Sequence, residues 1–280
     1  MVRNHGQMGQ FERAMRPRIG ITGPDRGGAT AWFFTALNIL LAGGKPYRIT
    51  PAHPVSPEKL DGLILGGGAD VDPEAYTRDD FIDQYLQQTL KAKHLNIFRR
   101  VGRFISWLYY PLLFLLRMAF SRKSLKISKE RDQLEFKLLD DIVRENKPVL
   151  GICRGSQIIN VYFKGSLFEN INIFYYEEPN PHSIFPVKTI YLKAGSKLAG
   201  ILKIDTLRVN ALHNQAVKKE GENIRVAARE ENQVVQGIEH TLRNFIIGVQ
   251  WHPEYLIFHK RQRGLFRAFT VAAGSTHKSS

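Results

Sequence analysis

Residues 148–163 read PVLGICRGSQIINVYF, and this stretch decides the fold that we expect. Its apolar beginning, 148–152, has the length of a buried strand, and its end, 156–163, has the apolar pattern of a helix. Glycines stand two positions before and two positions after Cys153, where a sharp turn would leave no room for side chains. A strand, Gly-x-Cys-x-Gly and a helix in this order predict a nucleophile elbow with cysteine in place of serine.

Outside this stretch, apolar strand-like runs alternate with helical patterns in the first half of the chain. A helix capped by Thr30 follows the first run, and another helix begins at Glu130. After Pro179 the strand-like runs dominate. The runs lie at 18–22, 45–49, 62–65, 187–192, 207–209, 224–228, 234–239 and 245–249. We therefore predict an α/β fold with a mostly parallel central sheet that an antiparallel or mixed part extends.

The composition bounds the class of protein. The chain has 280 residues, of which 43% are hydrophobic and 24% charged, and this suffices for a globular domain with a sizeable core. A single cysteine excludes an intrachain disulfide and a multi-cysteine metal site and suggests a reducing compartment. We expect no metal and no cofactor. Residues 1–17 form a polar, basic tail without the apolar core of a secretory signal, which favours the cytoplasm.

The position of Cys153 at the start of a predicted helix would govern its reactivity. The partial positive charge of a helix N-terminus favours the thiolate, which is the reactive form of cysteine. The backbone N–H of Arg154 would then face a developing oxyanion. The alternative is an inert cysteine buried at the end of a strand, which is common for free cysteines. The glycines and the flanking strand and helix favour the nucleophile.

A cysteine nucleophile needs a base, and the base needs a group that holds its tautomer. His252 lies in VQWHPE at 249–254, directly after an apolar run. In an extended segment Glu254 would point to the same side as His252, and Pro253 would stiffen the link. The alternative is a surface histidine–glutamate pair at the end of a strand.

Taken together, GICRGSQ at 151–157 and VQWHPE at 249–254 closely resemble the class I glutamine amidotransferase-like superfamily. Within it, the chain resembles the gamma-glutamyl-gamma-aminobutyrate hydrolase family. Three further segments carry that narrower resemblance: LGGGADVDP at 65–73, Glu130-Arg-Asp132 with Glu135, and VNALHNQ at 209–215. The resemblance covers roughly residues 18–258 apart from one insert.

The resemblance implies a flavodoxin-like sandwich and a triad of Cys153, His252 and Glu254. It also implies attack on a gamma-glutamyl amide, a thioester intermediate, and release of glutamate and an amine. We accordingly expect a hydrolase domain over 18–270, interrupted by an insert over 78–129, with a flexible tail over 271–280.

The glycine-rich loop completes the implied site. In this family the second oxyanion donor comes from such a loop, which implies Gly67 or Gly68 here. Three successive glycines would also let backbone N–H groups approach a ligand closely. A plain tight turn is the alternative. A nucleotide phosphate loop is disfavoured, because no Gly-Lys-Ser or Gly-Lys-Thr follows.

The resemblance also places Gln157, His213 and Gln215 in the substrate pocket, although His213 fits a buried structural histidine equally well. The chain departs from the family at Asn232-Gln233 and at Gln236, where the family has Asp-Gly and Glu. These changes remove negative charge near the last strands. They bear on the substrate more than on the chemistry.

The insert over 78–129 is the larger departure. Its part from 84 to 129 holds ten lysines and arginines and no acidic residue, and 104–116 reads FISWLYYPLLFLL. That run is short for a membrane span and contains a proline. It is consistent with packing on its own domain or on a second subunit as a homodimer, or with an anionic membrane interface. The hypothetical contacts are Trp107, Tyr109, Tyr110, Leu112 and Phe114.

We therefore expect a cytoplasmic gamma-glutamyl amide hydrolase, peripheral on the inner membrane if the insert binds lipid. Its partner would be a small gamma-glutamyl substrate and not a nucleic acid, because the positive charge accompanies a long aliphatic run. One alternative is the glutaminase subunit of a glutamine amidotransferase, which needs a separate synthetase partner. The other is a non-catalytic, membrane-docked scaffold of the same fold.

Overall fold

The computed structural model describes residues 16–68, 129–175, 180–181 and 183–276. The expected tail up to residue 15 and the insert up to residue 128 lie outside these ranges, as do the hypothetical contacts of the insert. None of the helices within these ranges combines the length and the apolar character that a membrane crossing requires.

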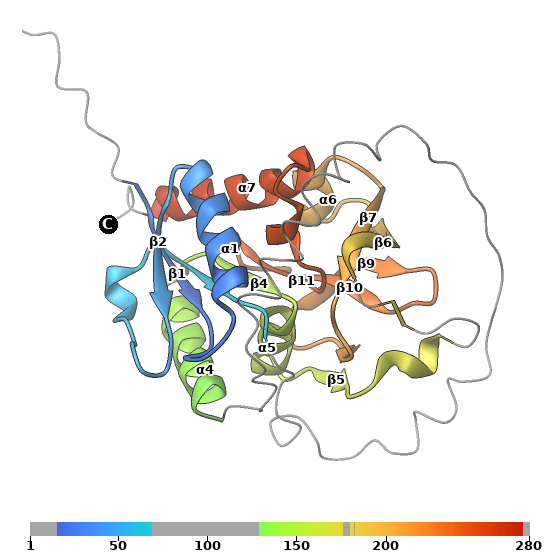
Figure 1. Ribbon diagram of the computed structural model, residues 1–280, viewed down its shortest axis with the longest axis horizontal. Helices are drawn as coiled ribbons and strands as arrows, with labels where there is room; N and C mark the ends of the chain where they lie inside the picture. The colour runs from blue at the N-terminus through green and yellow to red at the C-terminus, as the bar shows by residue number, and fades with distance from the viewer. Residues whose placement is uncertain (1–15, 69–128, 176–179, 182, 277–280) are drawn as a thin grey trace, which may run out of the picture.

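A mixed sheet of nine strands forms the centre of the described part of the chain (Figure 1). In spatial order, the first five strands run parallel to one another and the others pair antiparallel. The order is β2 (Lys45–Ile49), β1 (Arg18–Thr22), β3 (Gly62–Leu65), β4 (Val149–Ile152), β11 (Ile246–Val249), β10 (Val235–His240), β9 (Ile224–Glu230), β6 (Ser183–Leu192) and β7 (Thr206–Ala211). The predicted parallel centre with an antiparallel extension is confirmed.

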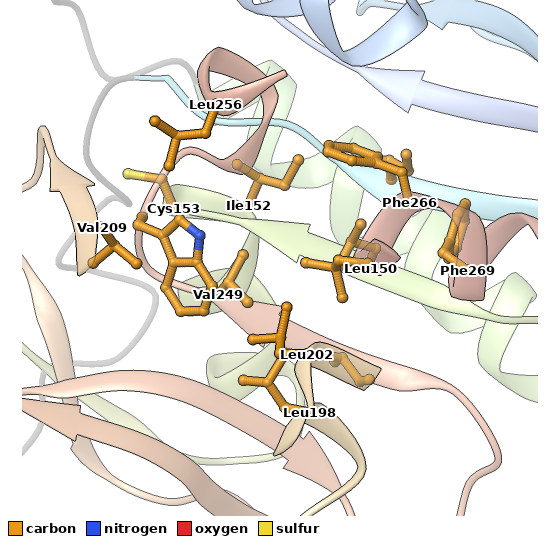
Figure 2. Packing of buried hydrophobic residues seen from close by; sticks show 14 of the residues in the cluster. Leu150, Ile152, Cys153, Leu198, Leu202, Val209, Val249, Leu256, Phe266 and Phe269 are labelled. Atoms are coloured by element: carbon orange, nitrogen blue, oxygen red, sulfur yellow. The ribbon is translucent and has the colours of Figure 1, made fainter. Parts of the chain in front are cut away.

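Helices cover both faces of this sheet. α1 (Ala29–Leu41) and α7 (Lys260–Thr276) pack on one face, and α4 (Lys129–Arg144) and α5 (Arg154–Tyr162) pack on the other. Alternate side chains of β4 therefore enter two separate hydrophobic clusters. Figure 2 shows part of the first cluster, where strand residues meet α7: Leu150, Ile152, Val249, Phe266 and Phe269.

Smaller elements surround these layers. β5 (Ser166–Phe168) and β8 (Ala216–Lys219) form a two-stranded antiparallel sheet, and α6 (Lys197–Leu202) packs against α7. Single turns of 3-10 helix occur at η1 (Pro57–Lys59), η4 (Ile171–Phe174) and η5 (Pro253–Leu256).

Two expectations about helix ends are wrong. Thr30 does not cap α1: the helix begins at Ala29 after Gly28, whose left-handed backbone (φ 66°) occupies the cap position. Residues 271–276 do not form a tail, because α7 continues to Thr276 and Ala273 is completely buried. The apolar side chains of α7 pack against the sheet, and this packing extends the helix beyond the expected boundary.

The arrangement of the parallel strands brings distant loops together. Gly66–Gly68 follow β3, Cys153 follows β4, and His252 comes shortly after β11. These three strands are neighbours in the sheet and run parallel, so the segments leave it at the same edge. Open α/β sheets bind their ligands at this carboxyl edge. Figure 2 shows Cys153 at the end of β4.

Candidate active site

Cys153 occupies a sharp turn between β4 and α5. Its backbone has φ 52° and ψ −107°, a conformation that residues other than glycine rarely adopt. Neither flanking glycine has room for a side chain: a Cβ on Gly151 would lie 2.6 Å from the carbonyl of Gly155, and one on Gly155 would collide with the carbonyl of Leu65. The cysteine therefore sits in a strained elbow at the N-terminus of α5, as predicted.

The structure places His252 and Glu254 next to Cys153. The Nδ1 atom of His252 lies 2.7 Å from Oε1 of Glu254, and the Cys153 side chain is close enough to the imidazole to act on its pKa. All three side chains are buried. One part of the prediction is wrong in detail: Glu254 meets His252 through the 3-10 turn η5 and not through an extended segment.

The charge state of His252 follows from these contacts. Burial alone would lower the pKa of His252, but the Glu254 carboxylate and the Cys153 sulfur raise it from its usual 6.5 to about 10. At neutral pH the ring is therefore an imidazolium. A cation beside a cysteine favours the thiolate.

Two contacts that the sequence analysis missed hold His252 in place. Asn210 in β7 accepts a hydrogen bond from the His252 N–H at 2.8 Å and donates one to the His252 carbonyl at 3.0 Å. The ring of Tyr255 stacks on the imidazole, with centroids 5.5 Å apart and an interplanar angle of 25°. Asn210 lies in the VNALHNQ motif, so its type was visible in the sequence, but its role depends on the pairing of distant segments.

The glycine-rich loop lies close to the predicted catalytic pair, Cys153 and His252. A Cβ on Gly67 would lie 2.7 Å from Cε1 of His252 and 3.7 Å from Cβ of Cys153. A Cβ on Gly66 would collide with the Thr22 carbonyl, and one on Gly68 with the Arg131 guanidinium. These glycines are therefore required by close approach, since none of them has a positive φ.

The three residues assigned to the substrate pocket also lie together, in a buried amide network beside the triad. Gln157 donates to the carbonyl of Gln215 at 3.1 Å and to Oε1 of Gln250 at 3.2 Å. His213 Nδ1 lies 2.9 Å from the same carbonyl of Gln215. Gln250, which the sequence analysis passed over, approaches the sulfur of Cys153 with its Nε2 at 3.6 Å.

The departure from the family at Gln236 has a physical explanation here. Its amide nitrogen lies 3.2 Å from Nε2 of His213 and 2.6 Å from Oε1 of Glu230, so it donates to both. Glu230 is itself buried and paired with Lys188 at 3.1 Å. A glutamate at 236 would place a second carboxylate against Glu230, which an amide avoids. The Gln236 amide and the Gln215 carbonyl both fit a His213 ring that carries its proton on Nδ1 and accepts at Nε2.

The sequence around this site resembles that of known proteins. The family model described as Peptidase C26 matches residues 115–254, which include the three residues of the predicted triad. A Schizosaccharomyces pombe protein named "Putative glutamine amidotransferase PB2B2.05" is 30% identical over 224 residues, which are 78% of this chain and 72% of its own length. The chain belongs to the Peptidase C26 family. It is thus a member of the class I glutamine amidotransferase-like superfamily, as the motifs indicated.

Other relatives of this C26 protein are more distant. The gamma-glutamyl-gamma-aminobutyrate hydrolase PuuD of Escherichia coli K12 is 28% identical over 134 residues, which are 45% of this chain and 53% of PuuD. Among solved structures, the glutaminase domain of Trypanosoma brucei CTPS with bound acivicin has a TM-score of 0.53 at 12% identity. It covers 92% of this chain and 94% of that domain. At this identity the likeness supports the fold alone.

The imidazolium form of His252 predicts how the alkylation rate of Cys153 depends on pH. We expect iodoacetamide to alkylate Cys153 at neutral pH on the order of tenfold faster in the wild type than in a His252→Gln variant, because glutamine supplies no cation for the thiolate. Since the pKa of His252 is raised to about 10, the imidazolium should persist through mildly alkaline pH. The advantage should be largest at neutral pH and should narrow as the pH passes about 8.5, where an ordinary thiol ionises without a cation beside it. Rates are read by mass spectrometry, with His259→Gln as the matched control. Equal rates in wild type and His252→Gln would contradict the assigned charge state.

Proposed function

We propose that this C26 protein hydrolyses gamma-glutamyl amides through a thioester on Cys153 and releases glutamate and an amine. The observation that carries the proposal is the buried contact chain Cys153–His252–Glu254, with 2.7 Å between the last two side chains, at a strained elbow. Family membership supports cysteine amide hydrolysis in general, and the relative named gamma-glutamyl-gamma-aminobutyrate hydrolase supports the narrower substrate.

The geometry supports a two-step reaction. The Cys153 sulfur attacks the amide carbon, and the carbonyl oxygen becomes an oxyanion that faces the N–H of Arg154 and those of Gly67 and Gly68. His252 gives its proton to the departing nitrogen, so the carbon–nitrogen bond breaks and the amine leaves. Water, deprotonated by His252, then attacks the thioester carbon, and glutamate leaves as the sulfur is released.

The buried amide network is suited to the glutamyl part of the substrate. Gln157 is almost completely buried, and its Oε1 atom has no hydrogen-bond partner among the described residues. A buried acceptor without a partner is costly, and a ligand N–H would satisfy it. We infer that Gln157, with His213 and Gln215 beside it, recognises the amino acid end of the substrate.

Glutamate release from a panel of gamma-glutamyl amides tests the proposal. The panel includes gamma-glutamyl-gamma-aminobutyrate and glutamine, and acid quenching with mass spectrometry looks for a glutamyl adduct on Cys153. Release with the adduct supports the hydrolase. Release from glutamine alone, increased by a synthetase partner, would favour a glutaminase subunit. No release and no adduct would overturn the proposal in favour of a non-catalytic scaffold.

The function of the insert is a separate proposal. We propose that its basic, apolar part at 84–129 binds an anionic membrane surface, because cationic side chains flank an apolar run there that itself contains aromatic residues. The full chain should then float with vesicles that contain anionic lipid and sediment with purely zwitterionic ones, while a variant without 84–129 binds neither. Self-association of the full chain that is lost on deletion, without lipid binding, would show a homodimer contact instead.

A methyl group at Gly67 tests the close approach of the glycine loop. We expect Gly67→Ala to lower kcat for gamma-glutamyl amides by about 10²-fold, because its Cβ would lie 2.7 Å from Cε1 of His252 and displace the base. Gly200→Ala is the matched control, since no atom lies within 4 Å of the added carbon and the residue is in a helix. Unchanged kcat in Gly67→Ala would show that the loop does not contact the base during the reaction.

A further inference from the structure

A buried arginine from outside the triad contacts the glycine loop. Arg131, in the first turn of α4, is 3% exposed, and its Nη2 atom donates to the carbonyls of Gly66 at 2.9 Å and Gly67 at 3.1 Å. Its Nε atom donates to Oε1 of Glu135 at 2.8 Å. One guanidinium therefore holds two consecutive carbonyl groups of the loop.

These two bonds determine where the loop N–H groups point. In a trans peptide the carbonyl and the following N–H point in opposite directions, and the described chain contains no cis peptide. With its carbonyls turned toward Arg131, the loop must turn the N–H groups of Gly67 and Gly68 away from it. A Cβ added to Gly67 would face His252 and Cys153, whereas a Cβ added to Gly68 would face Arg131. The loop thus runs between the guanidinium and the catalytic pair.

We propose that Arg131 is a positioning residue that sets the peptide orientation of the Gly66–Gly68 loop and so directs its N–H groups into the oxyanion site. The inference rests on the proposed function, because an oxyanion forms only if Cys153 attacks a carbonyl carbon. Arg131 does not touch the substrate in this role. It acts through the two peptide groups that it holds.

The same buried carboxylate links the loop to the elbow. Glu135 accepts hydrogen bonds from Arg131, from the side chain of Arg154 and, at 2.6 Å, from Oγ1 of Thr22. Thr22 Oγ1 in turn accepts the N–H of Gly66 at 3.1 Å. Arg154 also pairs with Asp132, so two arginines face two carboxylates in this cluster. The two halves of the oxyanion site, one in the loop and one at Arg154, are therefore held against one shared group.

The guanidinium fork is essential to this arrangement. A planar arginine can donate along several fixed directions at once, to Glu135 on one side and to two carbonyls on the other. A lysine at 131 would keep the positive charge beside Glu135, but its one ammonium would have to replace both Nε, which bonds Glu135, and Nη2, which bonds the two carbonyls. Arg131→Lys therefore changes the geometry of the loop while it preserves the charge of the cluster.

The test compares two reactions of Cys153 that differ in their need for an oxyanion site. Acylation by p-nitrophenyl acetate forms a sulfur–carbon bond to the acetyl carbon through an oxyanion and expels p-nitrophenolate. Alkylation by iodoacetamide displaces iodide from a saturated carbon and forms no oxyanion. We expect Arg131→Lys to slow acylation on the order of 30-fold and to change alkylation by less than about twofold. Arg225→Lys, at an arginine paired with buried Glu239 away from the loop, should change neither rate.

Several outcomes would overturn the proposal. Equal losses in acylation and alkylation would show a general distortion, and no loss in either would show that the loop keeps its orientation without the fork. Absence of Cys153-dependent acylation in the wild type would show that the loop forms no oxyanion site. Arg131→Gln is measured as a second variant, and thermal unfolding identifies which variants fold. Neither reagent is a gamma-glutamyl compound. The ratio of the acylation rate to the alkylation rate can therefore be measured even if the protein does not hydrolyse gamma-glutamyl amides.

Discussion

Alanine in place of Cys153 is expected to lower kcat/KM for gamma-glutamyl amides by about 10⁴-fold or more, because the thioester cannot form without the sulfur. The side chain is small and 4% exposed, and the N–H groups of the elbow remain in place. Binding of the substrate should therefore survive while turnover is lost. Glutamate release and a direct binding measurement on the same variant separate the two.

Cys153→Ser is the matched variant, since it keeps a hydroxyl nucleophile in a side chain of similar size. We expect it to retain a small activity above the alanine variant and an unfolding temperature close to that of the wild type. Full activity in Cys153→Ala would contradict the assigned nucleophile. It would indicate that water activated directly by His252 attacks the amide instead.

Glutamine in place of Glu254 is expected to lower kcat on the order of 10³-fold, with a smaller change in KM. The carboxylate is 1% exposed, its Oε1 lies 2.7 Å from Nδ1 of His252, and its Oε2 has no hydrogen-bond partner among the described residues. The charge of this group therefore acts on the imidazole, and it holds the His252 pKa high. A neutral amide would remove that stabilisation of the imidazolium, so less of the protonated His252 that serves as the general acid would be present in the first step.

Glu222→Gln is the control for Glu254→Gln. Glu222 pairs with Lys164 at 2.7 Å, but both side chains are largely exposed, so loss of this pair should leave kcat unchanged. Steady-state kinetics on gamma-glutamyl amides gives kcat and KM separately. A wild-type kcat in the Glu254→Gln variant would show that the Glu254 carboxylate has no part in catalysis.

The strands and the grouping of Cys153, His252 and Glu254 were predictable because their signals are local. Buried strands such as β3, β4 and β11 consist of short apolar runs, and all of their residues are buried. His252 and Glu254 are two residues apart, and the elbow lies within a few residues of Cys153. The helix α7 was missed, although its apolar side chains, such as Phe266 and Phe269, belong to one core cluster. Its beginning is basic and its end looked like a tail, and only packing against the sheet shows how far it extends.

The amino-acid sequence by itself determined the parallel α/β centre, and it predicted the nucleophile, its base and the group that orients the base. Each of these depends on residue types at short separations, which backbone sterics and side-chain periodicity govern directly. The tertiary structure alone decided which distant groups support them. Asn210 clamps His252 from 42 residues away, Gln250 reaches Cys153 across 97 residues, and Arg131 holds the Gly66 carbonyl across 65. Such contacts depend on the order of strands in the sheet, because that order decides which loops meet at its carboxyl edge.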